Sequence, residues 1–257
     1  MSVTIGQVLE LLDEMAPPEL AESYDNVGLL AGHPAWPVER ILVALDLTMG
    51  AVEEAKKIGA QLIVTHHPIL FRGRKNLRED DAEGAAVCAM IRAGIGLIAA
   101  HTNFDNASCG VNDALAEALG LRDVCPLAQG MRIGLLEKAQ TPETIGMMIE
   151  EKLGGRSRVY VQSPDGLIER VAVCGGAGGC FFEIAAQAGA QAFVTGEVKH
   201  HEALAAVEGG LCLIEAGHYE TEHIAIKLLA DGLQKRINAV QYNVTVNVSA
   251  YAPFWRV

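Results

Sequence analysis

The chain has 257 residues, half of them hydrophobic, and a formal net charge of −12 at pH 7. An acidic chain repels phosphate backbones, which excludes general nucleic-acid and anionic-membrane binding, whereas a local basic pocket can still hold a small anionic substrate. Six cysteines without a C-x-x-C pair are typical of reduced, buried thiols. No apolar run approaches the roughly 20 residues of a membrane span and no basic leader opens the sequence, so we expect a cytoplasmic protein.

Apolar strands alternate with helices in the first half of the chain. Thr4 caps a predicted helix that runs to Met15, and two prolines follow it. The further predicted elements are a strand over 41–45, a helix over 51–58, a strand over 61–65, a helix over 83–93 and a strand over 96–100. Because strands that alternate with helices form parallel sheets, we predict an α/β fold.

The second half of the chain repeats this plan. A predicted strand over 170–174 enters a glycine-rich turn, and a helix over 182–188 follows. The sequence GAQAFVT at 189–195 matches GAQLIVT at 59–65 in five of seven positions. Residues 214–218 likewise match 97–101, each an apolar strand that ends in histidine with a carboxylate four residues later. We interpret these matches as an internal duplication that gives two similar lobes.

The predicted lobes cover residues 1–126 and 127–223. Residues 224–257 are expected to form a helix and a strand that pack back on the lobes. Parallel strands present functional side chains at their carboxyl ends, so two lobes that face each other would bring their strand ends around one cleft.

Imidazole and carboxylate side chains follow three of these strands. They are the pair His66-His67 and the clusters His101-x-x-x-Asp105 and His218-x-x-x-Glu222. Such ligands without a thiolate favour a catalytic or exchangeable metal pair with positions open to water, rather than structural zinc. The alternative for the histidine pair is a strand-end turn in which both side chains bond to backbone. The alternative for His101 is that it contacts a metal ligand without binding the metal itself.

Two further segments are candidates for substrate binding. The basic loop with Arg72, Arg74 and Lys75 follows the histidine pair and either binds an anionic group or is an ordinary solvated loop. Gly176 and Gly178 belong to the glycine-rich turn, where backbone N–H groups can hold phosphate. The alternative is a tight turn with close packing, since the turn matches neither dinucleotide nor P-loop patterns.

Acid–base candidates are Glu197, His201 and His101, and no nucleophile signature accompanies them. Asp25 and Asn26 either contact the site or form an Asx turn.

Five stretches of sequence resemble one known family. In chain order they are ESYDNVGLLAG (22–32), VTHHPILF (64–71), AAHTNFDNASCGVNDALAEALGL (99–121), GEVKHHEA (196–203) and EAGHYETE (215–222). They are similar to the NIF-three-like dinuclear-metal proteins, often named GTP cyclohydrolase 1 type 2 homolog, in the compact form without an inserted domain. One departure is Tyr24, where the family usually has Trp.

The resemblance implies two interlocked α/β lobes with a metal site in the cleft between them, and a toroidal homohexamer whose inner cavity the metal sites line. It implies two divalent ions per chain, of zinc, iron, manganese or nickel, among which these ligand types do not select. The implied ligands are His66, His67, Asp105, His218 and Glu222, with Glu222 as the bridging carboxylate and His101 near the site.

Two functions fit these observations. The first is a metal-dependent hydrolase that acts on a nucleotide or a related heterocycle, as the family name suggests. The second is a non-enzymatic metal-handling or regulatory protein, since the sequence has no dedicated acid–base pair. A scaffold for a protein partner ranks last, because no exposed apolar motif supports it. The residues themselves do not choose between the first two, because function resides in the pocket and not in the fold.

Overall fold

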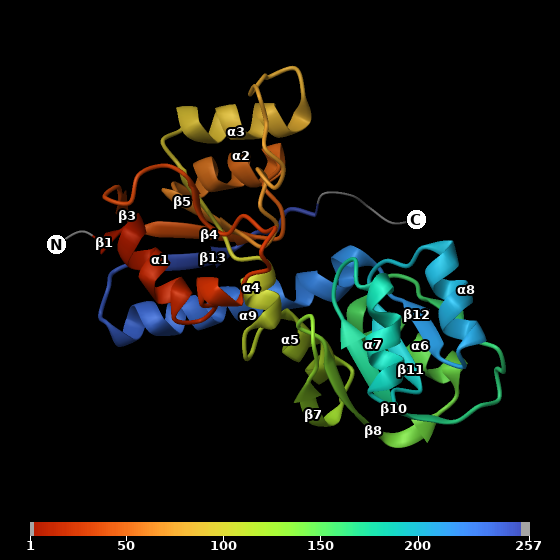
Figure 1. Ribbon diagram of the computed structural model, residues 1–257. Helices are drawn as coiled ribbons and strands as arrows, with labels where there is room; N and C mark the ends of the chain where they lie inside the picture. Colours follow the sequence, from red (N-terminus) through yellow and green to blue (C-terminus); the bar gives the residue numbers. More distant parts are fainter. Residues whose placement is uncertain (1–2, 253–257) are drawn as a thin grey trace. The chain divides into compact units, whose positions relative to one another are not determined.

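The computed structural model describes residues 3–252, which form two compact units (Figure 1). Residues 3–108 and 226–252 make the first unit, and residues 109–225 make the second. Helix α9 (His218–Ala239) begins in the second unit and ends in the first. Both units contain a β-sheet with helices, as predicted for an α/β protein.

The first unit has a five-stranded sheet. Its strand order is β13 (Thr245–Val248), β4 (Arg40–Ala44), β5 (Leu62–Thr65), β6 (Gly96–Ala99) and β2 (Gly28–Ala31). The first four strands are parallel and β2 is antiparallel to β6. Strand β2 is not among the predicted elements. A small antiparallel pair, β1 (Val3–Thr4) and β3 (Pro37–Val38), accompanies the sheet.

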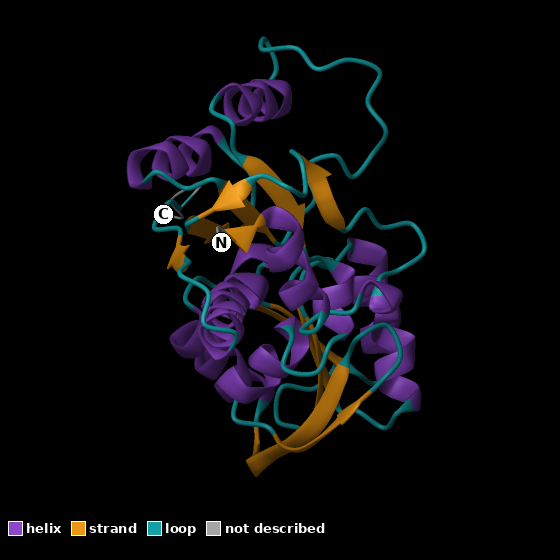
Figure 2. Ribbon diagram, turned by 90° about the vertical axis from the view of Figure 1, so that its left-hand side faces the viewer, coloured by secondary structure: helices purple, strands orange, loops and turns teal. Residues whose placement is uncertain are grey.

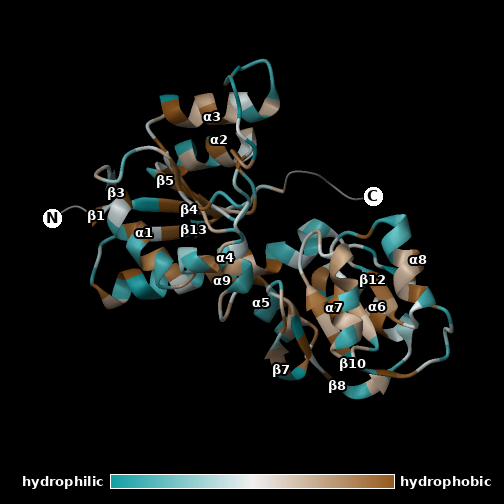
Figure 3. Cartoon of the chain, in the orientation of Figure 1, coloured by the Kyte–Doolittle hydropathy of each residue, from teal (hydrophilic) through white to brown (hydrophobic). Residues whose placement is uncertain are grey.

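Helices cover both faces of this sheet (Figure 1). Helices α2 (Met49–Ile58) and α3 (Ala82–Arg92) pack on the face that carries Leu42, Ile63 and Leu97. Helix α1 (Ile5–Asp13) lies on the other face, where Ile5 packs against Gly96. Figure 3 shows hydrophobic residues along β5, which these helices bury from both sides. Two short helical turns complete the unit, η1 (Pro18–Leu20) and α4 (Thr102–Asn106).

The predicted cap of the first helix is confirmed. The Thr4 side chain accepts a hydrogen bond from the Gln7 backbone N–H, and the Gln7 side chain accepts one from the Thr4 N–H. This capping box satisfies two of the backbone donors that a helix start leaves without a partner in the helix.

The second unit has a six-stranded sheet. Its order is β7 (Arg122–Pro126), β8 (Arg132–Gln140), β10 (Ile168–Cys174), β11 (Ala192–Thr195), β12 (Cys212–Glu215) and β9 (Arg158–Tyr160). Strands β10, β11 and β12 are parallel, and the others pair antiparallel. One face packs against α5 (Val111–Ala118) and α6 (Pro142–Leu153), the other against α7 (Phe182–Gln187) and α8 (His200–Glu208). The short 3-10 turn η2 (Gly179–Phe181) directly precedes α7. Figure 2 distinguishes the helices of the structure, in purple, from its strands, in orange.

The two units share a local hydrogen-bond pattern at the start of a parallel strand. The Gln61 side chain accepts from the backbone N–H of Arg40 at 3.0 Å, and the Gln191 side chain accepts from that of Arg170 at 3.0 Å. Each glutamine backbone N–H in turn donates to the carbonyl of the same arginine. This pattern gives the sequence match at 59–65 and 189–195 a structural reason, while the duplication itself stays a prediction.

The second match differs from the prediction by one residue. Ala100 donates to the Thr65 carbonyl and Ala216 donates to the Thr195 carbonyl, so Ala216 is the structural counterpart of Ala100. His101 therefore corresponds to Gly217, which adopts a φ of 93°, and His218 follows one residue later. The left-handed conformation of Gly217 changes the direction of the chain before α9. A comparison of sequence patterns does not detect this change.

The observed division also differs from the predicted lobes. Helix α5 and strand β7 lie within the predicted first lobe, residues 1–126, yet α5 packs on β8 and β10, and β7 pairs with β8. They therefore belong to the second unit, which begins at residue 109. Strand β13 pairs with β4 and brings the end of the described chain back into the first unit.

The cysteines are only partly as predicted. All six are free thiols, but Cys109, Cys125 and Cys180 are exposed, and only Cys174 and Cys212 are buried. None of the helices within residues 3–252 is long and apolar enough to cross a membrane.

A substitution of Phe193 in β11 tests the assignment of the hydrophobic core of the second unit. The Phe193 side chain is fully buried between the sheet and α8. We expect Phe193→Ala to lower the free energy of unfolding by about 3–5 kcal/mol, because it removes buried surface and leaves a cavity. Urea unfolding measures this loss. Leu204→Ala on the exposed side of α8 is the control, and an equal loss there would contradict the assignment of the core.

Candidate metal centre

Three histidines meet at the carboxyl edge of the first unit's sheet. His66 and His67 follow β5, and His101 follows β6. Each offers a ring nitrogen, and these three atoms lie within 4.8 Å of one another. The rings of His66 and His67 are tilted by 48° with centroids 5.1 Å apart. Two adjacent imidazoles thus reach one site after β5, where an ideal strand would point them to opposite faces.

Each of these imidazoles is fixed through its Nδ1 atom. His66 Nδ1 bonds to the Ala100 carbonyl at 2.8 Å, and His67 Nδ1 bonds to the Asp46 carboxylate at 2.8 Å. His101 Nδ1 bonds to the Asp25 carboxylate at 2.9 Å. Carbonyl and ionised carboxylate oxygens only accept, so Nδ1 must donate in each case. The Nε2 atom of each neutral ring then carries the lone pair that a metal ion requires.

Asp105 brings a carboxylate to the same edge. It lies on α4, one helical turn after His101, and its Oδ1 is 3.6 Å from His66 Nε2. His66 is fully buried, and the buried ring of Phe104 lies 6.4 Å from it. The short helix therefore positions a hard oxygen ligand beside an imidazole nitrogen in a site shielded from solvent on one side.

Asp25 holds more than the His101 ring. Its carboxylate also accepts from the backbone N–H of Thr102 at 3.0 Å, from the Thr102 hydroxyl and from the Asn26 N–H. Burial raises the pKa of Asp25, but the hydrogen bonds from His101 and Thr102 outweigh it and hold that pKa well below its usual range. Of the two alternatives for this residue, the structure therefore supports a contact with the site.

Asp46 was not among the sequence candidates. It follows β4 at the same carboxyl edge as His66 and His67. The strand-end rule that identified the histidines would also have found Asp46, had every polar residue after a predicted strand been considered.

The second unit contributes another imidazole and carboxylate. His218 and Glu222 lie one turn apart at the start of α9, with His218 Nε2 3.0 Å from Glu222 Oε2. His218 Nδ1 bonds to Glu197 Oε1 at 2.8 Å, so this imidazole follows the same pattern as the other three. Glu197 therefore orients the His218 ring, whereas an acid–base group would keep its carboxylate available for a substrate. His201, the third acid–base candidate, is exposed in the first turn of α8.

Gly176 makes room for this pair. A Cβ atom there would overlap Glu222 Oε1 and would lie 3.3 Å from His218 Nε2. Its φ of +62° also belongs to the region that glycine adopts without strain. The glycine-rich turn therefore serves close packing around a ligand pair, the simpler of its two predicted roles.

Three backbone N–H groups of the same turn already donate hydrogen bonds within the protein. The N–H of Gly175 donates to Asn112 at 2.7 Å, and the N–H groups of Gly176 and Gly178 donate to the hydroxyls of Thr221 and Thr195 at 3.1 Å. Donors that already have protein partners do not form a phosphate cradle, so the prediction that Gly176 and Gly178 bind substrate finds no support here.

The basic loop follows the histidine pair and borders a pocket. Arg74 forms ion pairs with Asp81, at 2.8 Å, and with Glu83. Arg72 and Lys75 are exposed. Arg72 and Arg74 line a pocket of about 440 Å³ together with His67 and Asp46, whereas Lys75 does not.

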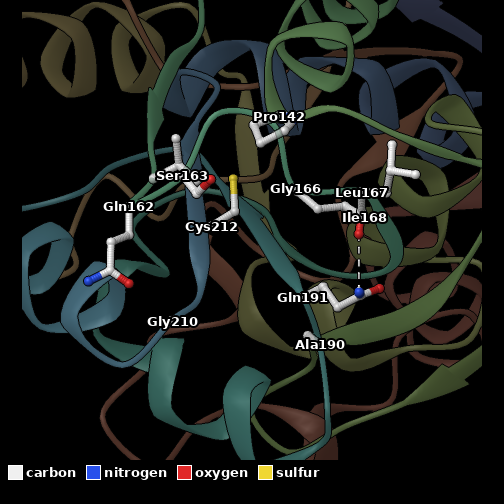
Figure 4. Close-up of a pocket in the computed structure, with 11 residues that line it drawn as sticks. Pro142, Gln162, Ser163, Gly166, Leu167, Ile168, Ala190, Gln191, Gly210 and Cys212 are labelled. Atoms are coloured by element: carbon white, nitrogen blue, oxygen red, sulfur yellow. Dashed lines mark hydrogen bonds between the residues drawn. The ribbon is translucent and has the colours of Figure 1, made fainter.

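A second pocket, of about 310 Å³, lies elsewhere in the second unit (Figure 4). It sits at the amino ends of β10, β11 and β12, where Ile168, Gln191 and Cys212 line it. Burial raises the pKa of the Cys212 thiol to about 11, so this sulfur is a poor nucleophile or metal ligand at neutral pH. The pocket lies at the strand ends opposite His218 and Glu222.

The donor set fits a divalent metal. Imidazole nitrogens with a fixed tautomer, together with carboxylates, are typical ligands of zinc, iron, manganese and nickel. The residue at position 176 leaves space for the Glu222 carboxylate beside His218. In the first unit His66, His67, His101 and Asp105 come together, and in the second His218 and Glu222 do.

Comparison with known proteins places these residues in a family. The model of the Duf34/NIF3 (NGG1p interacting factor 3) family matches residues 3–253. This chain belongs to the Duf34/NIF3 family. A relative in Clostridium perfringens, named GTP cyclohydrolase 1 type 2 homolog, is 32% identical over 97% of this chain and 98% of its own length. The NIF3 homolog of Schizosaccharomyces pombe is 32% identical over 86% of each chain.

Solved structures of Duf34/NIF3 relatives share the fold. A NIF3-related protein of Bacillus cereus superposes with a TM-score of 0.94, at 25% identity over 100% of this chain and 99% of the other. A hypothetical protein of Staphylococcus aureus gives a TM-score of 0.93 at 30% identity, with both chains covered completely. The sequence resemblance to the NIF-three-like proteins is therefore confirmed, and so is the α/β fold expected from it.

Gly176→Ala tests the space that Glu222 occupies. We expect this variant to lose bound metal, because its methyl group displaces the Glu222 carboxylate. Inductively coupled plasma mass spectrometry of the purified protein measures the metal content. Gly189→Ala is the matched control, since Gly189 also has a positive φ but nothing within 4 Å of its Cβ position. Both variants bear a backbone strain of about 1–2 kcal/mol, so equal metal loss in both would contradict this role.

Asp46→Ala tests the orienting contact to His67. We expect metal affinity to fall by about 10–100-fold, because the ring loses the acceptor that fixes its tautomer. Competition with a fluorescent chelator measures that affinity. Asp80→Ala is the control, since Asp80 pairs with Arg78 on the surface, and an unchanged affinity in Asp46→Ala would contradict the prediction.

Proposed function

We propose that this Duf34/NIF3 protein binds two divalent metal ions and acts as a metal-dependent hydrolase on a nucleotide or related heterocycle. The proposed ligands are His66, His67, Asp105, His218 and Glu222, with Glu222 as the bridging carboxylate. The observation that carries the proposal is the shared pattern of the histidines: His66, His67 and His218 are each fixed through Nδ1 by an oxygen acceptor, which leaves Nε2 of each ring on the side of the other proposed ligands.

The chain's own residues prepare these ligands for an ion. Asp46 and Glu197 accept the Nδ1 proton of His67 and His218, which fixes each ring and increases its basicity. Asp25 does the same for His101, whose Nε2 is then a further donor near the site. A bound divalent ion supplies Lewis acidity and lowers the pKa of water, which provides a nucleophile near neutral pH.

The names of the relatives motivate the first substrate to test. Several of them are named GTP cyclohydrolase 1 type 2 homolog. Hydrolysis at C8 opens the guanine imidazole ring with one water and leaves a formamide, and a second water then hydrolyses that formamide to release formate. Both steps need an activated water and a positioned ring.

A second function, metal handling without turnover, is favoured by the exposure of two proposed ligands. The side chains of His67 and His218 are 23% and 32% exposed, so a partner or chelator can approach an ion that they hold. This function predicts metal exchange between folded proteins and no product from any nucleotide.

The proposal includes the homohexamer that the family resemblance implies, with the metal sites on its inner cavity. Light scattering of the metal-replete protein measures this assembly. A hexamer that persists in a ligand variant would separate assembly from metal binding.

Incubation with nucleotides tests the hydrolase. Protein loaded in turn with zinc, iron, manganese or nickel is incubated with GTP and a nucleotide panel, and products are identified by mass spectrometry. We expect a defined product such as formate from the wild-type protein and none from Asp105→Ala, which lacks one proposed ligand. Full activity of Asp105→Ala would refute the hydrolase, and the absence of product with all four metals would favour metal handling.

A further inference from the structure

The pocket beside His67 borders one proposed ligand of the metal centre. It has a volume of about 440 Å³, within the range of roughly 300–1,000 Å³ typical of small-molecule sites. Its walls come from the segments that follow β4 and β5, and they include Asp46 and His67 themselves. A ligand in this pocket therefore contacts the residue whose Nε2 is proposed to hold metal.

The charges in this pocket leave one cationic group for a ligand. Asp46 is engaged by His67, and Glu83 is engaged by Arg74, which also pairs with Asp81. Arg72 forms no ion pair with any residue between 3 and 252, although it lines the same pocket. A guanidinium group binds phosphate or carboxylate through two parallel hydrogen bonds, so Arg72 is suited to an anion.

The pocket also presents an aromatic surface. The Phe71 ring contacts His101 edge to face at a centroid distance of 5.9 Å, and Tyr24 does the same to Phe71 at 6.2 Å. Phe71 nevertheless remains 42% exposed and lines the pocket together with Leu47 and Ile69. The ring is held near the histidine cluster by its aromatic neighbours while part of its surface stays open, which suits contact with another planar ring.

A hydrogen bond fixes the segment that carries Phe71. The Asn26 side chain donates to the Leu70 carbonyl at 2.9 Å, and Asn26 follows the Asp25 that orients His101. The aromatic surface and the histidine cluster are thus tied to the same loop, so a ring placed on Phe71 has a defined position relative to the cluster.

We propose that this pocket is the substrate site and that its ligand is a planar aromatic heterocycle carrying a phosphate group. The ring packs against Phe71 in the pocket that His67 also lines, and the phosphate binds Arg72. This inference rests on the proposed metal-dependent function and adds the place where its substrate binds, with a residue for each of the two parts of that substrate.

Binding of four probes to the metal-replete protein tests the proposal. The probes are GMP, guanosine, ribose 5-phosphate and inorganic phosphate, measured by isothermal titration calorimetry so that turnover is not required. We expect Arg72→Ala to weaken the binding of GMP by about tenfold or more and to leave the affinity for guanosine within about twofold, because only GMP loses a charge-assisted pair to its phosphate. Phe71→Ala is expected to weaken the binding of GMP and of guanosine but not the binding of ribose 5-phosphate.

Lys75→Ala is the matched control, since Lys75 is an exposed cation of the same loop that does not line the pocket. An equal loss of GMP affinity in Lys75→Ala and Arg72→Ala would overturn the assignment, because it would reflect charge alone. No saturable GMP binding would overturn it as well. Equal binding of GMP and ribose 5-phosphate, unchanged in Phe71→Ala, would refute the aromatic part.

The metal content of every variant separates the two proposals. A wild-type protein that takes up no metal contradicts the proposed function, whatever its affinity for GMP. A metal-replete protein whose GMP affinity does not depend on Arg72 contradicts the pocket alone.

Discussion

The hydrogen bond between a histidine Nδ1 and an oxygen acceptor is the interaction on which the site depends. It occurs four times, at His66, His67, His101 and His218, with three carboxylates and one carbonyl as acceptors. Without it each ring could rotate or adopt the other tautomer, and its Nε2 atom would donate instead of accept. The acceptors come from the ends of neighbouring strands and from adjacent loops. The sheet therefore fixes not only where the imidazoles lie but also which nitrogen can bind a metal.

Parallel strand register explains why these groups meet. Residues after β4, β5 and β6 emerge at one edge, which brings Asp46, His67 and His101 within reach although they are far apart in sequence. The hydrogen-bond ladder continues past β5, since His66 and His67 donate their backbone N–H groups to the carbonyls of Ala44 and Leu45. The backbone that carries both histidines is thus held by the same kind of hydrogen bonds as the sheet. In the second unit the same logic operates through β11, β12 and the first turn of α9.

Much of this arrangement follows from the sequence, because strand–helix alternation and histidines at strand ends are local signals. The cap at Thr4 and the helices near residues 51–58 and 83–93 were predicted within a few residues. Three features were not predictable in this way. Strand β2 has turn-like composition and forms because β6 offers an edge. The place of Gly217 depends on a left-handed φ, and the partners of Glu197 and Asp46 are set by tertiary packing rather than by spacing.

The connectivity of the two units has a consequence for synthesis on the ribosome. The second unit is a continuous segment, so all of its strands are available once residue 225 has emerged. The sheet of the first unit is completed later. Strand β4 lies at its edge until β13 pairs with it, and β13 follows some two hundred residues later in the chain. Such distant pairing slows folding, and an unpaired hydrophobic strand edge invites aggregation. A nascent or truncated chain that ends before β13 exposes this edge, which makes it a natural target for chaperones.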